Sequence, residues 1–153
     1  MNTLEHTVLQ STGTVDWSST GHFAVLTPAP GTSESAPTFH RLVHIPIAAI
    51  IEDLRQLSLA RETTATSTDA VAVLLTAAAG TTDDEAAAHE GLFEALRGVV
   101  GSLTLELAPS GLRLNLVRAT DLDQARATLD FLATDAASFV AGSTLDLTQE
   151  TTS

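Results

Sequence analysis

The chain has 153 residues, of which 44% are hydrophobic, and it carries 19 acidic against 7 basic residues for a formal net charge of −12. This length fits one domain, residues 1–153, with a single hydrophobic core. So acidic a surface repels phosphate backbones, which argues against nucleic acid as a partner. Cys, Tyr and Lys are absent. Disulfides, thiol catalysis and two common catalytic residue types are therefore excluded.

No apolar run reaches the roughly 18 residues that a membrane span needs. The first ten residues do not combine a basic stretch with an apolar one, as a signal peptide does. We therefore expect a cytoplasmic protein that makes no membrane contact.

The first 61 residues predict two short strands, a loop and a helix. β-favouring runs at residues 7–10 and 22–26 flank a turn-rich connection, which indicates a hairpin or two neighbouring strands. Residues 27–38 hold three of the five prolines and show no apolar period, so they are expected to form a loop. Apolar residues then recur at three- and four-residue steps from 39 to 61. This pattern predicts an amphipathic helix, interrupted or bounded by Pro46.

A buried strand and a long helix follow. The continuous apolar run at 70–80 is typical of a strand covered on both faces in a parallel sheet. The helix over 83–108 has acids at 83–85 that complement its dipole, and Thr82 or Asp83 as its N-cap. Pro109 and Gly111 end it.

The glycines of this helix, at positions 91, 98 and 101, each cost about 1 kcal/mol relative to alanine in a helix interior. They suggest that another backbone packs unusually close to the helix. The alternative is a tight contact with the sheet beneath it.

A strand at 112–117, a helix at 121–133 with Asp121 as its N-cap, and a short strand at 144–148 complete the pattern. Strands and helices thus alternate from residue 23 onward. This alternation predicts an α/β fold with a doubly wound, mostly parallel sheet of about four to six strands and right-handed crossovers.

Two stretches resemble the C-terminal half of the short-chain dehydrogenase/reductase family, which transfers hydride between NAD(P) and alcohols or ketones. LTLELAPSGLRLNLV (103–117) is similar to a helix, stop and strand of that family, and FLATDAASFVAGSTLDL (131–147) is similar to its ending. With weaker likeness upstream, the resemblance covers residues 23–148. It implies a truncated Rossmann-like three-layer sandwich.

The resemblance also implies that the catalytic positions of the family are degenerate here. The proton-donating Tyr of the family falls at His89, and the Lys four residues later falls at Phe93. The catalytic Ser would lie at Thr76 or Ala77, and the Asn of the preceding helix near His44. We therefore expect no catalytic residue.

The cofactor side departs further from the family. The family opens with a strand, a TGxxxGIG turn and a helix that receives the pyrophosphate. Gly13, Gly21 and Gly31 lie in no such context, so we expect no cofactor and the loss of the first two strand–helix units. That loss would leave the strand at residue 23 as an exposed edge.

The N-terminal extension, residues 1–22, offers a cover for this edge. We expect its run around residues 6–10 to pair there as an extra strand, with a frayed arm as the alternative. Residues 149–153 are expected to form a disordered tail.

Two further histidine arrangements carry chemistry. His89 alone could act as a general acid or base, although a helix-face histidine without a catalytic partner is the alternative. His40 and His44 have the i,i+4 spacing of a metal pair, and Glu90 or Asp53 would be the candidate ligand to complete such a site. Without a motif around them a surface or capping role is expected, and no metal.

In the family, the helices corresponding to 46–61 and 84–108 pack against their copies in a second subunit, and the final helix and strand form another interface. The resemblance therefore implies a non-catalytic subunit that pairs with a full-length active short-chain dehydrogenase or with itself. The expected interface residues are Ile47, Ile51, Leu54, Leu92, Phe93, Leu96, Val100, Leu103 and Phe139.

Two other functions stay open. A small-ligand or acyl-thioester binding protein would have a cavity without convergent titratable groups. A cofactor-independent enzyme would have a pocket lined by His89, His44 and Thr76.

Overall fold

The computed structural model describes residues 6–31, 37–63, 67–77 and 82–148. Five parallel strands form one sheet in the order β1-β2-β3-β4-β5. The strands are β1 (Thr7–Ser11), β2 (Phe23–Pro28), β3 (Ala70–Thr76), β4 (Arg113–Ala119) and β5 (Thr144–Asp146). The α-helices are α1 (Ile45–Thr63), α2 (Asp83–Leu107) and α3 (Leu122–Leu132). The α/β three-layer sandwich predicted from the sequence is confirmed, and residues 149–153 lie outside the described residues.

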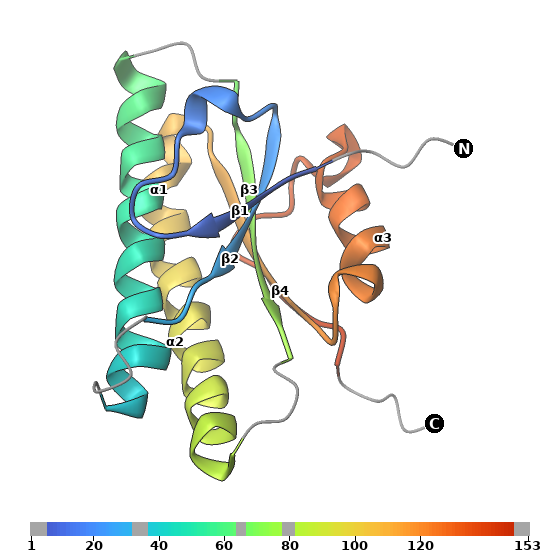
Figure 1. The fold of residues 1–153 in the computed structure, drawn as a ribbon. Coiled ribbons are helices and arrows are strands. Elements are labelled where there is room, and N and C mark those ends of the chain that lie inside the picture. Colours follow the sequence, from blue (N-terminus) through green and yellow to red (C-terminus); the bar gives the residue numbers. More distant parts are fainter. Residues whose placement is uncertain (1–5, 32–36, 64–66, 78–81, 149–153) are drawn as a thin grey trace.

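Helices cover both faces of the sheet, α1 and α2 on one side and α3 on the other (Figure 1). From β2 to β5 the chain steps across the sheet in one direction, so crossovers of a single hand would put all three helices on one face. The crossover through α3 therefore has the opposite hand to the two before it. The expectation of right-handed crossovers throughout is wrong, because α3 must bury the face that α1 and α2 leave open.

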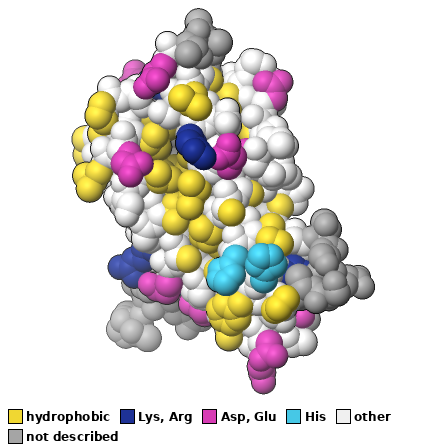
Figure 2. Space-filling model, turned by 90° about the vertical axis from the view of Figure 1, so that its left-hand side faces the viewer, with side chains coloured by type: hydrophobic (Ala, Val, Ile, Leu, Met, Phe, Trp, Pro, Cys, Tyr) yellow, Lys and Arg dark blue, Asp and Glu magenta, His cyan; other side chains and the backbone are white. Residues whose placement is uncertain are grey.

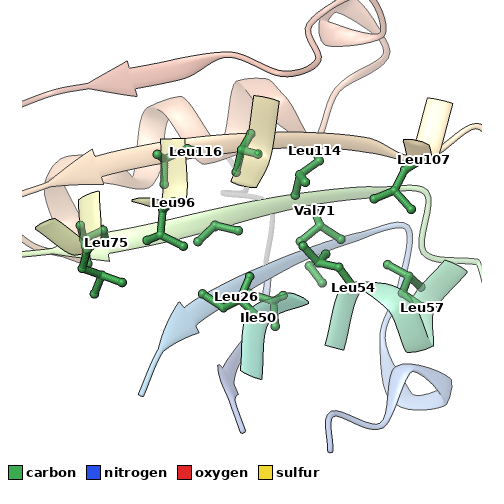
Figure 3. Close-up of a cluster of buried hydrophobic side chains, with 14 of the residues drawn as sticks. Leu26, Ile50, Leu54, Leu57, Val71, Leu75, Leu96, Leu107, Leu114 and Leu116 are labelled. Atoms are coloured by element: carbon green, nitrogen blue, oxygen red, sulfur yellow. The ribbon is translucent and has the colours of Figure 1, made fainter. Parts of the chain in front are cut away.

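The larger core cluster lies between the sheet and the helices α1 and α2 (Figure 3). Its labelled members are Leu26, Ile50, Leu54, Leu57, Val71, Leu75, Leu96, Leu107, Leu114 and Leu116. Alternate residues of β3 point to the opposite cluster beneath α3, so this strand is buried on both faces as its apolar run predicted. Each fully buried Val, Leu or Ile side chain contributes about 1.5–3 kcal/mol, so these two clusters supply most of the stability.

Pro46 lies in the first turn of α1 and is accommodated by a π-helical turn, His40–His44, directly before it. Proline has no N–H to donate and clashes with the carbonyl four residues back. The N–H of Ile45 bonds to the carbonyl of His40, five residues back, which gives the wider spacing of a π-turn. The helix predicted around Pro46 therefore forms without a break.

The ends of α2 follow the predicted signals. The Thr82 side chain accepts a hydrogen bond from the N–H of Glu85 at 3.1 Å, and Gly111 takes the left-handed conformation, φ 78°, after the short 3-10 turn Ala108–Ser110.

No helix in the described part of the chain is long and apolar enough to cross a membrane.

The N-terminal strand β1 covers the outer edge of β2. It runs parallel, with Thr7 opposite Ala24 and Ser11 opposite Pro28. The strand predicted around residues 6–10 therefore forms, and a hairpin is excluded because the two strands are parallel. Its connection to β2 contains only a short 3-10 turn, Trp17–Ser19, whose Trp17 side chain is buried in the larger core.

Asp53 of α1 holds this connection in place. Its side chain is fully buried and accepts hydrogen bonds from the Ser11 hydroxyl at 2.6 Å, the Gly13 N–H at 3.1 Å and the Val15 N–H at 3.0 Å. The indole N–H of Trp17 donates to the Asp53 backbone carbonyl at 2.9 Å. One helix residue thus anchors the end of β1 and the loop that follows it.

We predict that Asp53→Ala lowers the free energy of unfolding by about 3 kcal/mol or more. Three donors would lose their acceptor, and each unsatisfied buried group costs about 1–3 kcal/mol. The measurement is urea denaturation followed by circular dichroism.

The matched control is Glu52→Ala. Glu52 pairs with Arg55 at 3.1 Å on the exposed side of the same helix, and such surface pairs contribute about 0–1 kcal/mol. Equal losses in the two variants would contradict the anchoring role of Asp53.

Candidate functional site

A pocket of about 200 Å³ lies at the carboxyl ends of β2 and β3, the edge at which parallel α/β sheets bind ligands. It is lined by Thr27, Pro28, Pro30, Leu42, Pro46, Leu74, Leu75, Thr76, Glu85, His89 and Leu92. Most of these side chains are Pro or Leu, and the polar ones are two Thr, one Glu and one His. The site is therefore an apolar pocket with a few polar groups, as small-molecule sites usually are.

Helix α2 places Glu85 and His89 one turn apart on the face that lines the pocket. Burial lowers the pKa of His89 below its ordinary value of 6.5. The neighbouring Arg118 guanidinium lowers this pKa further, and the Glu90 carboxylate partly opposes the shift. His89 is therefore a neutral imidazole near neutral pH.

Arg118, from the carboxyl end of β4, covers the position where the resemblance places the family's Lys. Its guanidinium lies 4.4 Å from the ring centroid of the buried Phe93, forms an ion pair with Glu90 and lies 3.9 Å from Asp146. Arginine keeps its proton in proteins. This group supplies positive charge but cannot relay a proton.

The structure brings together only part of the predicted site. His89 and Thr76 both line the pocket, whereas Ala77 and His44 are not among its lining residues. The cofactor-independent enzyme therefore lacks one of its three groups. Glu85 was missed as a pocket residue because it also fits a helix-dipole role, although its i,i+4 spacing from His89 could have revealed it.

The suggested metal site does not assemble. The rings of His40 and His44 are 5.9 Å apart, edge to face, but the Asp53 carboxylate is held by the loop after β1 and Glu90 pairs with Arg118. In the ranges that the structure covers, no three His, Asp or Glu side chains form a group suited to a metal ion.

The resemblance would place the family's glycine-rich, pyrophosphate-binding turn at the loop after β1. Gly13 follows the strand β1 with φ 85°, but the described segment between β1 and β2 contains no α-helix, so it is not in the strand–glycine–helix context of the family. The N–H groups of Gly13 and Val15 donate to Asp53, and a three-residue 3-10 turn stands in place of a long helix. Backbone donors that could bind an anion are therefore satisfied by the chain's own carboxylate.

Three solved structures illustrate the similarity of this fold to known proteins. The enoyl-[acyl-carrier-protein] reductase (NADH) from Aquifex aeolicus VF5 has a TM-score of 0.62 and 18% identity over 86% of this chain and 62% of its own. A doubly substituted short-chain dehydrogenase/reductase of Serratia marcescens has a TM-score of 0.59 and 14% identity over 82% and 63%. A short chain dehydrogenase from Leptospira borgpetersenii serovar Hardjo-bovis, with bound NAD⁺, has 0.57 and 13% over 82% and 63%.

The chain has the fold of a short-chain dehydrogenase/reductase. It spans less than two thirds of the length of each of these three structures. No protein-family model matches the sequence. No curated protein matches it either.

The expected interface residues divide into two groups. Five of them are at most 6% exposed and pack within the chain's own core: Leu54, Leu92, Phe93, Leu96 and Val100. Their assignment to a partner surface was wrong, because α1 and α2 use this stripe to cover the sheet. Ile47 and Leu103 are partly buried at the margin of this core, while Ile51 and Phe139 are 38% and 81% exposed.

A shallow groove of about 430 Å³ lies on the outer face of α1 and α2. It is lined by Ile51, Glu94, Ala95, Gly98, Val99, Ser102 and Leu103. Apolar side chains form a band along this face of the molecule, with few charged groups within it (Figure 2). We refer to these seven residues as the α1–α2 groove.

Charge substitutions around His89 should move its pKa in opposite directions. Arg118→Gln removes a nearby positive charge and should raise the pKa, whereas Glu90→Gln removes a negative charge and should lower it. An NMR pH titration of the His89 ring protons measures both shifts. Unchanged values, or shifts of the same sign, would contradict this electrostatic assignment.

Because the pKa of His89 is lower in the folded state than in the unfolded chain, folding should be less favourable as pH falls below 6.5. His89→Gln should remove this part of the pH dependence. The matching measurement is urea denaturation at several pH values.

Proposed function

We propose that the chain is a non-catalytic subunit with the short-chain dehydrogenase fold. It pairs through the α1–α2 groove with a second subunit of that fold, either a full-length active short-chain dehydrogenase or another copy of this chain. The observation that carries the proposal is the internal hydrogen bonding of Asp53, which occupies the backbone donors after β1. A dinucleotide phosphate would have to displace a buried, triply hydrogen-bonded carboxylate.

The absence of the family's catalytic residue types also supports a non-catalytic role. The chain contains no Tyr and no Lys, so neither the proton donor nor the cation of the family's catalytic pair is available. Phe93 occupies the Lys position and lies in the core under Arg118. His89 and Thr76 line the pocket, but the third group of the predicted enzyme site, His44, is not among its lining residues.

The glycines of α2 support an external helix contact. A β-carbon at Gly91 would lie 3.2 Å from the Phe39 ring, so an internal contact accounts for that glycine. A β-carbon at Gly98 or Gly101 would meet nothing within 4 Å. The alternative of a tight contact with the sheet is therefore wrong for these two, and the small residues of the groove leave room for a partner's backbone.

Charge around the groove also suits a protein partner. Exposed ion pairs join Arg55 to Glu52 at 3.1 Å and Arg97 to Glu94 at 3.8 Å, one on each helix. The opposite charges offset each other locally, although the whole chain carries −12. Two such faces could approach without strong repulsion.

A second candidate function, small-ligand binding, is favoured by the apolar pocket between β2, β3 and α2. Acyl-thioester binding and a cytoplasmic location stay predictions.

We expect neither NAD(H) nor NADP(H) to bind the purified chain. Calorimetric titration to about 1 mM nucleotide should give no binding heat, because the donors after β1 are occupied. A dissociation constant in the micromolar range would contradict the proposal.

Gly98→Leu should weaken subunit association by about tenfold or more. A large side chain would fill the groove, and overpacking of a close contact typically costs about 1–3 kcal/mol. Sedimentation equilibrium measures pairing of the chain with itself. Co-expression followed by mass spectrometry identifies a retained dehydrogenase and shows whether its retention is lost in the variant.

The control is Ala87→Leu, at an exposed position of α2 that does not line the groove.

Gly98→Ala should raise the free energy of unfolding by about 1 kcal/mol, since alanine favours the helix and meets no obstacle. A chain that stays monomeric and retains no dehydrogenase would overturn the interface proposal.

A further inference from the structure

The pocket between β2, β3 and α2 has a distinct charge character. Glu85 is the one carboxylate among its described lining residues, and these residues include no Arg. Arg118 is not among the lining residues, and the carboxylates of Glu90 and Asp146 offset its charge. The charge that faces the pocket is therefore negative.

The N-terminal end of α2 also lies in this region, and the positive end of its helix dipole opposes the negative charge of Glu85. The helix end is equivalent to about half a positive charge. Three carboxylates, Asp83, Asp84 and Glu85, occupy its first turn. Their charge exceeds that of the dipole, and the net charge of −12 adds to the same sign. An anionic ligand is disfavoured here.

The apolar lining residues and the volume of the pocket limit the chemistry and the size of the ligand's uncharged part. Leu74, Leu75 and Leu92 line the pocket together with three prolines. The volume of about 200 Å³ is below the ~300–1,000 Å³ of pockets for drug-sized ligands. The space suits an apolar body no larger than a substituted ring or a short branched chain.

We propose that this pocket binds a small organic amine in its protonated form. The apolar body lies among the Leu and Pro side chains, and the ammonium group pairs with the Glu85 carboxylate. The same group donates a hydrogen bond to the ring nitrogen of His89, one turn further along α2. The proposal goes beyond the subunit function and does not depend on any partner.

His89 meets the chemical requirement for this role. Because burial and Arg118 lower its pKa, the imidazole is neutral near neutral pH and has one nitrogen free to accept. The Thr76 hydroxyl at the pocket offers another acceptor. These groups match the several donors of an ammonium group.

The test uses three probes of similar size and different charge: benzylamine, benzyl alcohol and benzoate. Binding to the full chain is followed by NMR chemical-shift titration near neutral pH. Benzylamine should bind about tenfold more tightly than benzyl alcohol, as a charge-assisted pair predicts, and benzoate should be weakest. Shifts should map to Glu85, His89 and Leu92.

Variants assign the effect to the pocket. Glu85→Gln should weaken benzylamine binding by about tenfold and leave benzyl alcohol unchanged. The control, Asp84→Asn, changes an exposed neighbouring carboxylate that does not line the pocket, and should alter affinity less than about twofold. Thr76→Trp, at an exposed strand end, should fill the pocket and block both probes.

Equal affinity for the amine and the alcohol, preference for benzoate, or an unchanged Glu85→Gln variant would overturn the proposal. Absence of binding by all three probes at about 10 mM would do the same, since a site with a dissociation constant of about 1 mM would be nearly saturated at this concentration. None of these results tests subunit pairing through the α1–α2 groove, so the ligand proposal can be overturned while the subunit proposal stands.

Discussion

The buried carboxylate of Asp53 is the interaction on which the N-terminal part of the fold depends. Two parallel strands, β1 and β2, are joined here through a 3-10 turn without the long helix that usually makes such a crossover. The connection buries Trp17 but otherwise offers little apolar surface, so its position rests on the donors that Asp53 accepts. The same bonds satisfy the backbone N–H groups of Gly13 and Val15, which are the type of donor that could otherwise contact an anion. One side chain thereby holds the end of the strand that completes the sheet and also satisfies the donors of the loop that follows it.

The sequence predicts the elements of this fold well because local signals govern them. The continuous apolar run of β3, the Thr82 cap and the Gly111 stop each act within a few residues. Asp53 shows the limit of such reasoning. It is a charged residue in an amphipathic helix, and its donors lie 38 to 42 residues earlier in the chain. Only the packing of β1 against α1 reveals that it is buried.

The candidate site shows the same division between local and long-range information. The i,i+4 spacing of Glu85 and His89 is visible in the sequence, but the pocket between them and the ends of β2 and β3 is not. Arg118 reaches Phe93 from a strand 25 residues later in the chain. Likewise, the apolar stripe through Leu92 indicates that one face of the helix is buried. The periodicity does not show whether the chain's own sheet or a partner subunit buries that face.

Helix α2 carries three tasks on different parts of its surface. Its inner stripe covers the sheet, its first turns line the pocket, and its outer face around Gly98 forms half of the groove. The inner stripe supplies the apolar burial that stabilises the fold. Glu85 and Gly98 lie outside this stripe, so substitutions there can test the proposed ligand and partner sites without removing core packing. The sheet is covered by only one face of α2, so the core packing that stabilises the fold does not depend on the Glu85 side chain or on the outer face around Gly98.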